Sequence, residues 1–276
     1  MNDLKGFDYL TTYGRHSVEP FKSSLTNETP AAGPSGVFLW RNTMPNEQLN
    51  DIVYVLKQNI DPYELTYSLR SIEKNFPHRK VWFIGSKPEG LTPDGSIYHQ
   101  QTGNTKGRLI KSSLLKVITS EDITEDFFWF NDDFFVMKPV DPSKFINFVD
   151  GTLEQRIQAL HKDPGPSPYM RELLKCQQEL LIKKHTQMNF DVHLPLLMNK
   201  SLAAKSVNQC SSPQFRSVYG NINKLPYEVM PDVKVYSLTS VPTESTYLST
   251  NDNTFRDGAV GRYIREVFSK PSRFEV

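Results

Sequence analysis

Two adjacent carboxylates interrupt an aromatic run in the middle of the chain. Residues 127–139 have the sequence FFWFNDDFFVMKP, which places Asn131, Asp132 and Asp133 among bulky apolar side chains. Such a run is typical of a buried strand, where an unpaired carboxylate must shift its pKa, find a partner or bind a metal. Mg²⁺ and Mn²⁺ take one or two carboxylates together with substrate phosphates, so Asp132 and Asp133 are candidate metal ligands and Asn131 a supporting residue. A turn whose acids hold their own backbone, or an exposed loop, would explain the same residues.

Three further residues in the second half carry suitable chemistry. His193 follows Asp191 by two positions in FDVHLP. On a strand the two side chains would share a face, and Asp191 would orient the imidazole for proton transfer. Arg216 in QFRSVYGN is a candidate for bidentate phosphate binding, and Asp252 in STNDNTF is a candidate to join the metal site. The structural alternatives are a structural histidine, a solvated arginine and a turn aspartate.

The elements that would position these residues begin near residue 50. Residues 51–56 (DIVYVL) predict a buried strand, and Asp61 before Pro62 predicts the start of a helix that ends before Pro77. Residues 79–86 (RKVWFIGS) predict the next strand. A strand, a helix and a strand in this order form a βαβ unit and imply a parallel sheet.

The alternation continues to the paired acids. Residues 96–101 predict a short third strand, residues 105–118 a helix, and a fourth strand ends at residues 131–133. In open α/β sheets ligands bind beyond the carboxyl ends of the strands, which is where the acids fall. We therefore expect an α/β, Rossmann-like fold with a mostly parallel sheet flanked by helices.

The flanking regions differ from this core. Residues 1–48 are expected to be a partly irregular N-terminal extension, because residues 26–36 (TNETPAAGPSG) are linker-like. Residues 49–276 are expected to form a single domain. Two helices separated by DPGPSP predict a helical insertion at about 152–187. A strand is expected around residues 232–238 and a helix after the turn that carries Asp252.

Composition narrows the functional classes. The chain has 276 residues with 32 basic and 31 acidic side chains, a balance that argues against a nucleic-acid groove. Its two cysteines form no disulfide framework, and no signal peptide or apolar stretch of ~20 residues is evident. The expectation is a cytoplasmic protein without a transmembrane segment, with peripheral membrane association left open.

The order of these motifs resembles the Stealth family. These proteins are bacterial capsular-polysaccharide phosphotransferases and the related N-acetylglucosamine-1-phosphotransferases. The similar motifs are DIVYVL, then DPYELTYSLRSIEKNFPHRKVWFIG, then ITEDFFWFNDDFF, a histidine-bearing segment and a late acid-bearing turn. The resemblance covers about residues 50–275. More loosely, the first half is similar to glycosyltransferases of the GT-A type.

The resemblance implies a transferase that holds a nucleotide-sugar donor with Mg²⁺ or Mn²⁺ and passes sugar-1-phosphate to a hydroxyl of a glycan or another acceptor. It implies functional positions at the residues that match the family's motifs: Asp51, Arg70, Asn131, Asp132, Asp133, His193 and Asp252. With the residue-level analysis, the catalytic candidates are His193, Asp133 and Asp191. The donor-phosphate candidates are Asp51, Arg70 and Arg216, and the metal candidates are Asp132, Asp133 and Asp252.

The chain departs from the family in its first motif, where VLKQNIDP lacks the expected tryptophan although the aspartate-proline pair is present. This leaves three alternatives open. One is a plain GT-A glycosyltransferase, including one that acts on modified DNA bases. The others are a metal-dependent nucleic-acid enzyme and a catalytically silent module that binds nucleotide or glycan.

Overall fold

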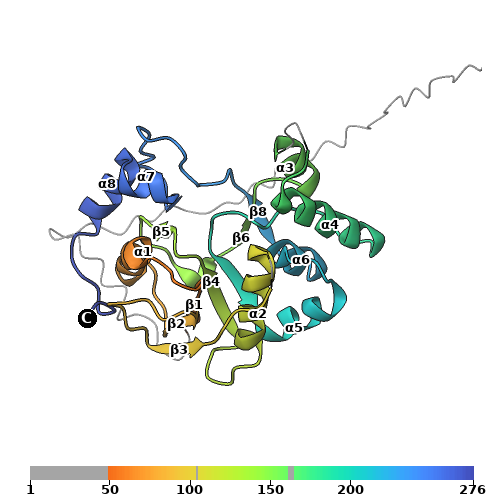
Figure 1. Cartoon of the computed structure of the whole chain (residues 1–276), viewed down its shortest axis with the longest axis horizontal. Helices are drawn as coiled ribbons and strands as arrows, with labels where there is room; N and C mark the ends of the chain where they lie inside the picture. The colour runs from red at the N-terminus through yellow and green to blue at the C-terminus, as the bar shows by residue number, and fades with distance from the viewer. Residues whose placement is uncertain (1–48, 104, 161–164) are drawn as a thin grey trace, which may run out of the picture. The chain divides into compact units, whose positions relative to one another are not determined.

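A computed structural model describes residues 49–103, 105–160 and 165–276, which belong to one compact unit, Trp40–Val276. Its centre is a five-stranded sheet in the order β3-β2-β1-β4-β7 (Figure 1). The first four strands are parallel, and β7 pairs antiparallel with β4 at the edge. The strands are β1 (Asp51–Val55), β2 (Val81–Gly85), β3 (Gly95–Tyr98), β4 (Asp126–Phe130) and β7 (Leu196–Asn199). The predicted mixed α/β fold with a mostly parallel sheet flanked by helices is confirmed. The predicted extension at residues 1–48 lies outside the described residues.

The first helix forms where the sequence predicts it. Helix α1 (Pro62–Asn75) begins after Asp61, whose carboxylate accepts a hydrogen bond from the Tyr63 amide at 3.0 Å. The N-cap carboxylate satisfies one of the amides that a helix start leaves unpaired. Leu65, Leu69 and Ile72 are fully buried and form the apolar face of the helix. Helix α2 (Lys106–Ile118) begins in the same way after Thr105.

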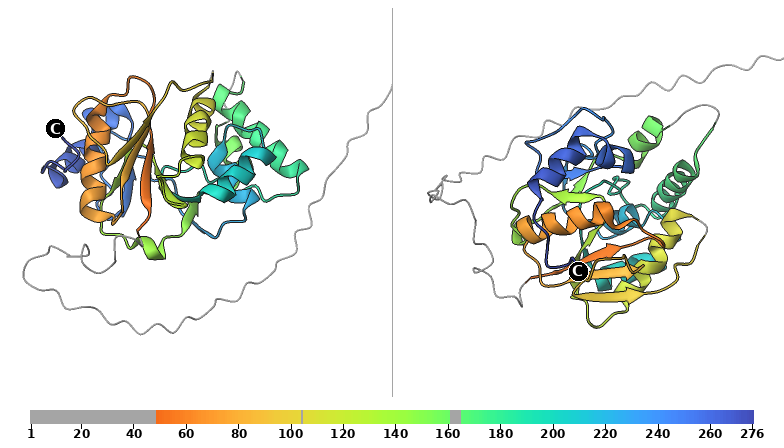
Figure 2. Two further views of the ribbon diagram at one scale, coloured as in Figure 1. Left: turned by 90° about the horizontal axis from the view of Figure 1, so that it is seen from below. Right: turned by 60° about the vertical axis from the view of Figure 1, so that its left-hand side comes forward.

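The sheet is buried on both faces because its side chains alternate between two cores. Ile52 and Tyr54 of β1 belong to the core that includes α1, while Val53 belongs to the core that includes α2. Figure 2 shows α1 on one side of the sheet and α2 on the other. The chain runs outward from β1 to β3 and then returns to place β4 on the other side of β1. The carboxyl ends of β1 and β4 therefore mark a topological switch point, the usual place for a ligand in open α/β sheets.

The second half adds helices and two small sheets. The predicted insertion contains two helices as expected, and residues 161–164 between them lie outside the described part. Strand β5 pairs with β9, and β6 pairs with β8. The strand predicted around residues 232–238 is wrong as a regular element, since only an isolated bridge joins Lys234 to Ser249. The elements are β5 (Phe134–Val136), a 3₁₀ turn (Pro142–Lys144), β6 (Asn147–Val149), α3 (Leu153–Leu160), α4 (Pro168–Ile182), α5 (Lys200–Gln209), α6 (Phe215–Ile222), β8 (Tyr227–Val229), β9 (Tyr247–Ser249), α7 (Asp252–Arg256) and α8 (Ala259–Val267).

Across the described helices, none is both long enough and apolar enough to cross a lipid bilayer.

Candidate functional site

The paired acids lie in a tight turn between β4 and β5. The turn closes with a hydrogen bond from the Phe134 amide to the Asn131 carbonyl at 3.3 Å. A cavity of about 380 Å³ opens beside the turn, at the carboxyl end of β4. The charged residues that line it are four carboxylates and three lysines: Glu64, Asp132, Asp133, Asp252, Lys57, Lys106 and Lys234. Three of the four carboxylates were predicted as metal ligands, and the structure brings these three together.

Two of the carboxylates resist ionisation. Burial raises the pKa of Asp132, and the charge of Asp133 raises it further. No other described residue donates a hydrogen bond to the Asp132 carboxylate. Burial, together with Asp133, Asp132 and Asp252, raises the pKa of Glu64 to about 7, although a 3.0 Å hydrogen bond from Thr250 opposes the shift. Close like charges disfavour ionisation, so the cavity holds more acid than its own cations neutralise.

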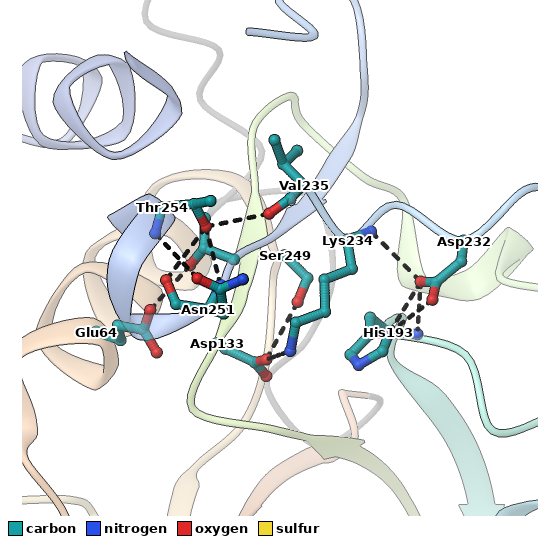
Figure 3. A network of polar contacts seen from close by, with 10 residues as sticks. Glu64, Asp133, His193, Asp232, Lys234, Val235, Ser249, Asn251 and Thr254 are labelled. Carbon is teal, nitrogen blue, oxygen red and sulfur yellow. Dashed lines mark hydrogen bonds and ion pairs between the residues drawn. The ribbon is translucent and has the colours of Figure 1, made fainter. Parts of the chain in front are cut away.

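Asp133 has a cation and a hydroxyl beside it. Lys234 Nζ lies 2.9 Å from its Oδ2, and Ser249 Oγ lies 3.2 Å from the same oxygen (Figure 3). Burial lowers the pKa of Lys234, but the charge of Asp133 and the hydrogen bond to it raise the value overall. Within the described residues the other oxygen of Asp133, Oδ1, has no hydrogen-bond partner and remains available to a ligand.

Two lysines at the cavity have no carboxylate partner among the described residues. Lys57 follows β1, and Lys106 is the first residue of α2. Both are exposed, and neither forms an ion pair with another described residue. Their charges act on Asp132 and partly offset the rise in its pKa. Unpaired lysines beside clustered carboxylates suit a ligand that brings both a cation and anionic phosphates.

His193 is oriented by a different residue from the one predicted. Its Nδ1 lies 2.8 and 2.9 Å from the two oxygens of Asp232, and its backbone amide also donates to Asp232 at 3.3 Å. Burial raises the pKa of Asp232, but the hydrogen bond and charge of His193 lower it overall. Asp191 instead accepts a 2.7 Å hydrogen bond from the Tyr169 hydroxyl. The prediction that Asp191 orients His193 is therefore wrong, because the segment is not a strand and its two side chains have separate partners.

The imidazole of His193 lies near Asp133, although it does not line the cavity. Figure 3 shows His193 and Asp133 on either side of the Lys234 side chain. The His193 ring also packs edge-on against Phe134, the residue that follows Asp133, with 6.3 Å between ring centroids. With Nδ1 held by Asp232, the Nε2 atom has no hydrogen-bond partner among the described residues. A base of this kind would accept a proton at Nε2.

Asp51 lies at the opposite end of the sheet from the other acids. It opens β1, and its register partner in β4 is Phe127, near the start of that strand. Its carboxylate is fully buried and accepts hydrogen bonds from Arg79 at 2.8 and 2.6 Å, from Trp82 Nε1 at 3.0 Å and from the Thr124 amide at 3.1 Å. This set of partners accounts for the residue structurally, and the carboxylate is not in the cavity that would hold a donor.

Arg70 and Arg216 are also committed elsewhere. Arg70 forms a bidentate ion pair with Glu275, at 2.8 and 2.5 Å, and donates to the Phe268 carbonyl at 3.0 Å. Arg216 is buried and donates to the Leu194 carbonyl. Neither side chain lines the cavity. The phosphate-binding role predicted for them suits Lys57 and Lys106 better.

The carboxylates fit a divalent cation in the manner of magnesium sites. Within the described residues, no three His, Cys, Asp or Glu side chains are arranged to surround one metal ion. Mg²⁺ does not need such a cage, because it keeps several waters and takes one or two carboxylates together with substrate phosphates. Burial and the neighbouring acids raise the pKa values of Asp132 and Glu64, and a bound cation would favour their ionised forms. Asp132 and Asp133 are the residues that could hold such an ion, and Glu64 and Asp252 line the same cavity.

Neither a scan against protein-family models nor a search of curated proteins finds a match to this chain. The geometry of the site therefore has to support any functional assignment.

Sequence reasoning missed Glu64 and Asp232 for different reasons. Glu64 is in the first turn of the helix that follows β1. In a βαβ unit this turn lies at the carboxyl end of the sheet, so the position carried a signal. Asp232 lies 39 residues from His193 in sequence, in a segment without regular structure. No local pattern indicates that pairing.

Proposed function

We propose that this chain is a metal-dependent transferase that acts on a nucleotide-activated sugar. The observation that supports this most strongly is the cavity at the β1–β4 switch point, where four carboxylates meet two lysines that pair with no carboxylate in the described part of the chain. Asp132 and Asp133 would hold Mg²⁺ or Mn²⁺, and Lys57 and Lys106 would bind the donor phosphates. The bound metal would neutralise charge on the leaving nucleotide.

His193 is the base in this proposal. Asp232 fixes Nδ1 and leaves Nε2 to take the proton from the acceptor hydroxyl as that hydroxyl attacks. Lys234 holds Asp133 by an ion pair, so the carboxylate is oriented before a ligand arrives. The lysine also limits negative charge next to the attacking oxygen.

Two outcomes are chemically distinct. In sugar-1-phosphate transfer the acceptor oxygen bonds to the sugar-linked phosphorus and a nucleoside monophosphate leaves. In glycosyl transfer the oxygen bonds to the anomeric carbon and the intact nucleoside diphosphate leaves. The resemblance of the N-D-D and S-L-R-S motifs to the Stealth family favours the first outcome, with a glycan or another hydroxyl compound as acceptor.

The experiment is incubation with UDP-, GDP- and CMP-activated sugars and Mn²⁺ or Mg²⁺, with and without chelator, followed by mass analysis of the released nucleotide. Water serves as a slow acceptor. From the UDP and GDP donors, monophosphate release supports phosphosugar transfer and diphosphate release supports glycosyl transfer. A CMP-sugar has a single phosphate, so it would release cytidine in phosphosugar transfer and CMP in glycosyl transfer.

Asp133→Ala tests the site. The matched control is Asp257→Ala, because Asp257 is an exposed acid that does not line the cavity. Full metal-dependent turnover by Asp133→Ala would contradict the assignment. Nucleotide binding that is unaffected by chelator, without release from any donor, would favour a binding module.

A further inference from the structure

Arg216 is a buried cation, and part of its guanidinium group has no hydrogen-bond acceptor among the described residues. Only 4% of its surface is exposed, and it belongs to α6, whose residues are all buried. Nη2 donates to the Leu194 carbonyl, while Nε and Nη1 have no partner within the described residues. Burial lowers its pKa to about 10 although Asp191, Asp133 and Asp232 oppose the shift. A buried, partly unpaired charge is unfavourable for folding, so its presence calls for a role other than stability.

The guanidinium lies between the carboxylate turn and the segment that carries His193, and its ring contacts are on the side of the turn. It stacks over the rings of Trp129 and Phe134, with Cζ 5.4 and 5.7 Å from the ring centroids. Trp129 is near the end of β4 and Phe134 opens β5, so the two rings flank the turn that carries Asp132 and Asp133.

The hydrogen bond of Arg216 reaches the other half of the site. Its acceptor, the Leu194 carbonyl, belongs to the residue that follows His193. The Phe134 ring that contacts the guanidinium also contacts the His193 ring. Arg216 thus contacts both the rings that flank the carboxylate turn and the residue that follows His193. It does not line the cavity itself.

We propose that Arg216 is a positioning residue that fixes His193 relative to the carboxylate turn, acting through the Leu194 carbonyl and the two aromatic rings. A planar guanidinium can stack on the rings and hydrogen-bond in its own plane at the same time, which lysine cannot do. The catalytic consequence rests on the proposed function, but the position of His193 can be measured without turnover.

The first test follows the imidazole of His193 by NMR, with its signals assigned from His193→Gln. Arg216→Met keeps the bulk of the side chain and removes the charge and the fork, and Arg216→Lys keeps only the charge. We expect the His193 signals to shift and broaden in Arg216→Met, with a smaller change in Arg216→Lys. The exposed arginine variant Arg171→Met should leave them unchanged. An unaltered His193 spectrum in Arg216→Met would overturn the proposal.

The second test separates positioning from donor binding. In Arg216→Met we expect kcat to fall at least about tenfold, since small misplacements of catalytic groups have effects of this size or larger. The donor KM and the half-saturating Mn²⁺ concentration should stay within about twofold of wild type. A rise in donor KM at unchanged kcat would instead make Arg216 a donor-binding residue and overturn the proposal.

The two hypotheses fail in different ways. If the wild-type chain releases no nucleotide, the proposed function fails while the NMR comparison still decides the position of His193. If Arg216→Met does not fold, Arg216→Lys supports both measurements against wild type.

Discussion

The two ends of the parallel sheet place carboxylates in opposite situations. At the amino end, Asp51 is fully buried but accepts hydrogen bonds from two side chains and a backbone amide. At the carboxyl end, burial and neighbouring acids together raise the pKa values of Asp132 and Glu64. A buried acid with every oxygen satisfied is part of the fold, whereas a cluster short of cations is prepared for a ligand. Burial alone therefore does not separate structural acids from candidate ligand-binding acids. The number of hydrogen-bond donors that each carboxylate has does separate them.

The largest effect should come from removing the Asp51 carboxylate at the amino end of the sheet. Asp51→Ala removes the acceptor that Arg79, the Trp82 indole and the Thr124 amide share, and Arg79 keeps the Asp122 carbonyl. We therefore expect a loss of about 3–5 kcal/mol in the free energy of unfolding. Urea denaturation measures it, and nucleotide release per folded molecule should not change. Reduced release at unchanged stability would instead restore a role for Asp51 in donor binding.

The reverse pattern is expected at the crowded end. Asp132→Asn removes a buried charge that Asp133 repels, so the free energy of unfolding should not fall at neutral pH. Metal-dependent nucleotide release should fall at least about 100-fold, the size expected for loss of one preorganised electrostatic group. Denaturation and release assays on the same preparation test both parts. A destabilised variant with normal release would remove the contrast between the two ends.

Glu64 makes the contrast dependent on pH. Its pKa is raised from 4.5 to about 7, so across this interval the unfolded chain loses the proton before the folded chain does. Stability therefore falls as pH rises from about 4.5 to about 7 and levels off above it. Allowing for partial exposure, Glu64→Gln should be more stable than wild type by about 2 kcal/mol at alkaline pH and equal to it at acidic pH.

Urea denaturation across this pH range measures the Glu64 effect, with the exposed acid variant Glu89→Gln as the control. Mn²⁺ favours the ionised carboxylate, so wild type should bind it more tightly as pH rises toward about 7. A stability difference between Glu64→Gln and wild type that does not change with pH would show that the pKa of Glu64 is not raised.

The sequence predicts the parts of this comparison that depend on local patterns. The strand at Asp51, the N-cap at Asp61 and the strand that ends before Asn131 follow from residue type and short-range periodicity. These elements are sufficient to place Asp132 and Asp133 at the carboxyl end of a mostly parallel sheet.

The partners of each charge could not be predicted, because tertiary packing chooses them. Asp51 meets Arg79 across a parallel strand pair, and Asp232 reaches His193 from a segment of irregular backbone. Arg70 and Glu275 form an ion pair although they lie near opposite ends of the domain in sequence. Periodicity indicates which face a side chain occupies, but it does not identify the residue opposite.

The smallest effect should come from Arg70, which the family resemblance would place at the donor. In the structure it joins α1 to the C-terminal segment through Glu275 and the Phe268 carbonyl. Both partners of the ion pair are partly exposed, so Arg70→Ala should lower the free energy of unfolding by only about 1–2 kcal/mol. The donor KM should match that of Arg171→Ala, because neither side chain lines the cavity. A tenfold rise in donor KM for Arg70→Ala alone would mean that the arginine leaves Glu275 to bind phosphate. The Arg70–Glu275 ion pair would then form only in the absence of the donor. In that case the hydrogen-bond partners of a charged side chain would not show whether its role is structural or functional.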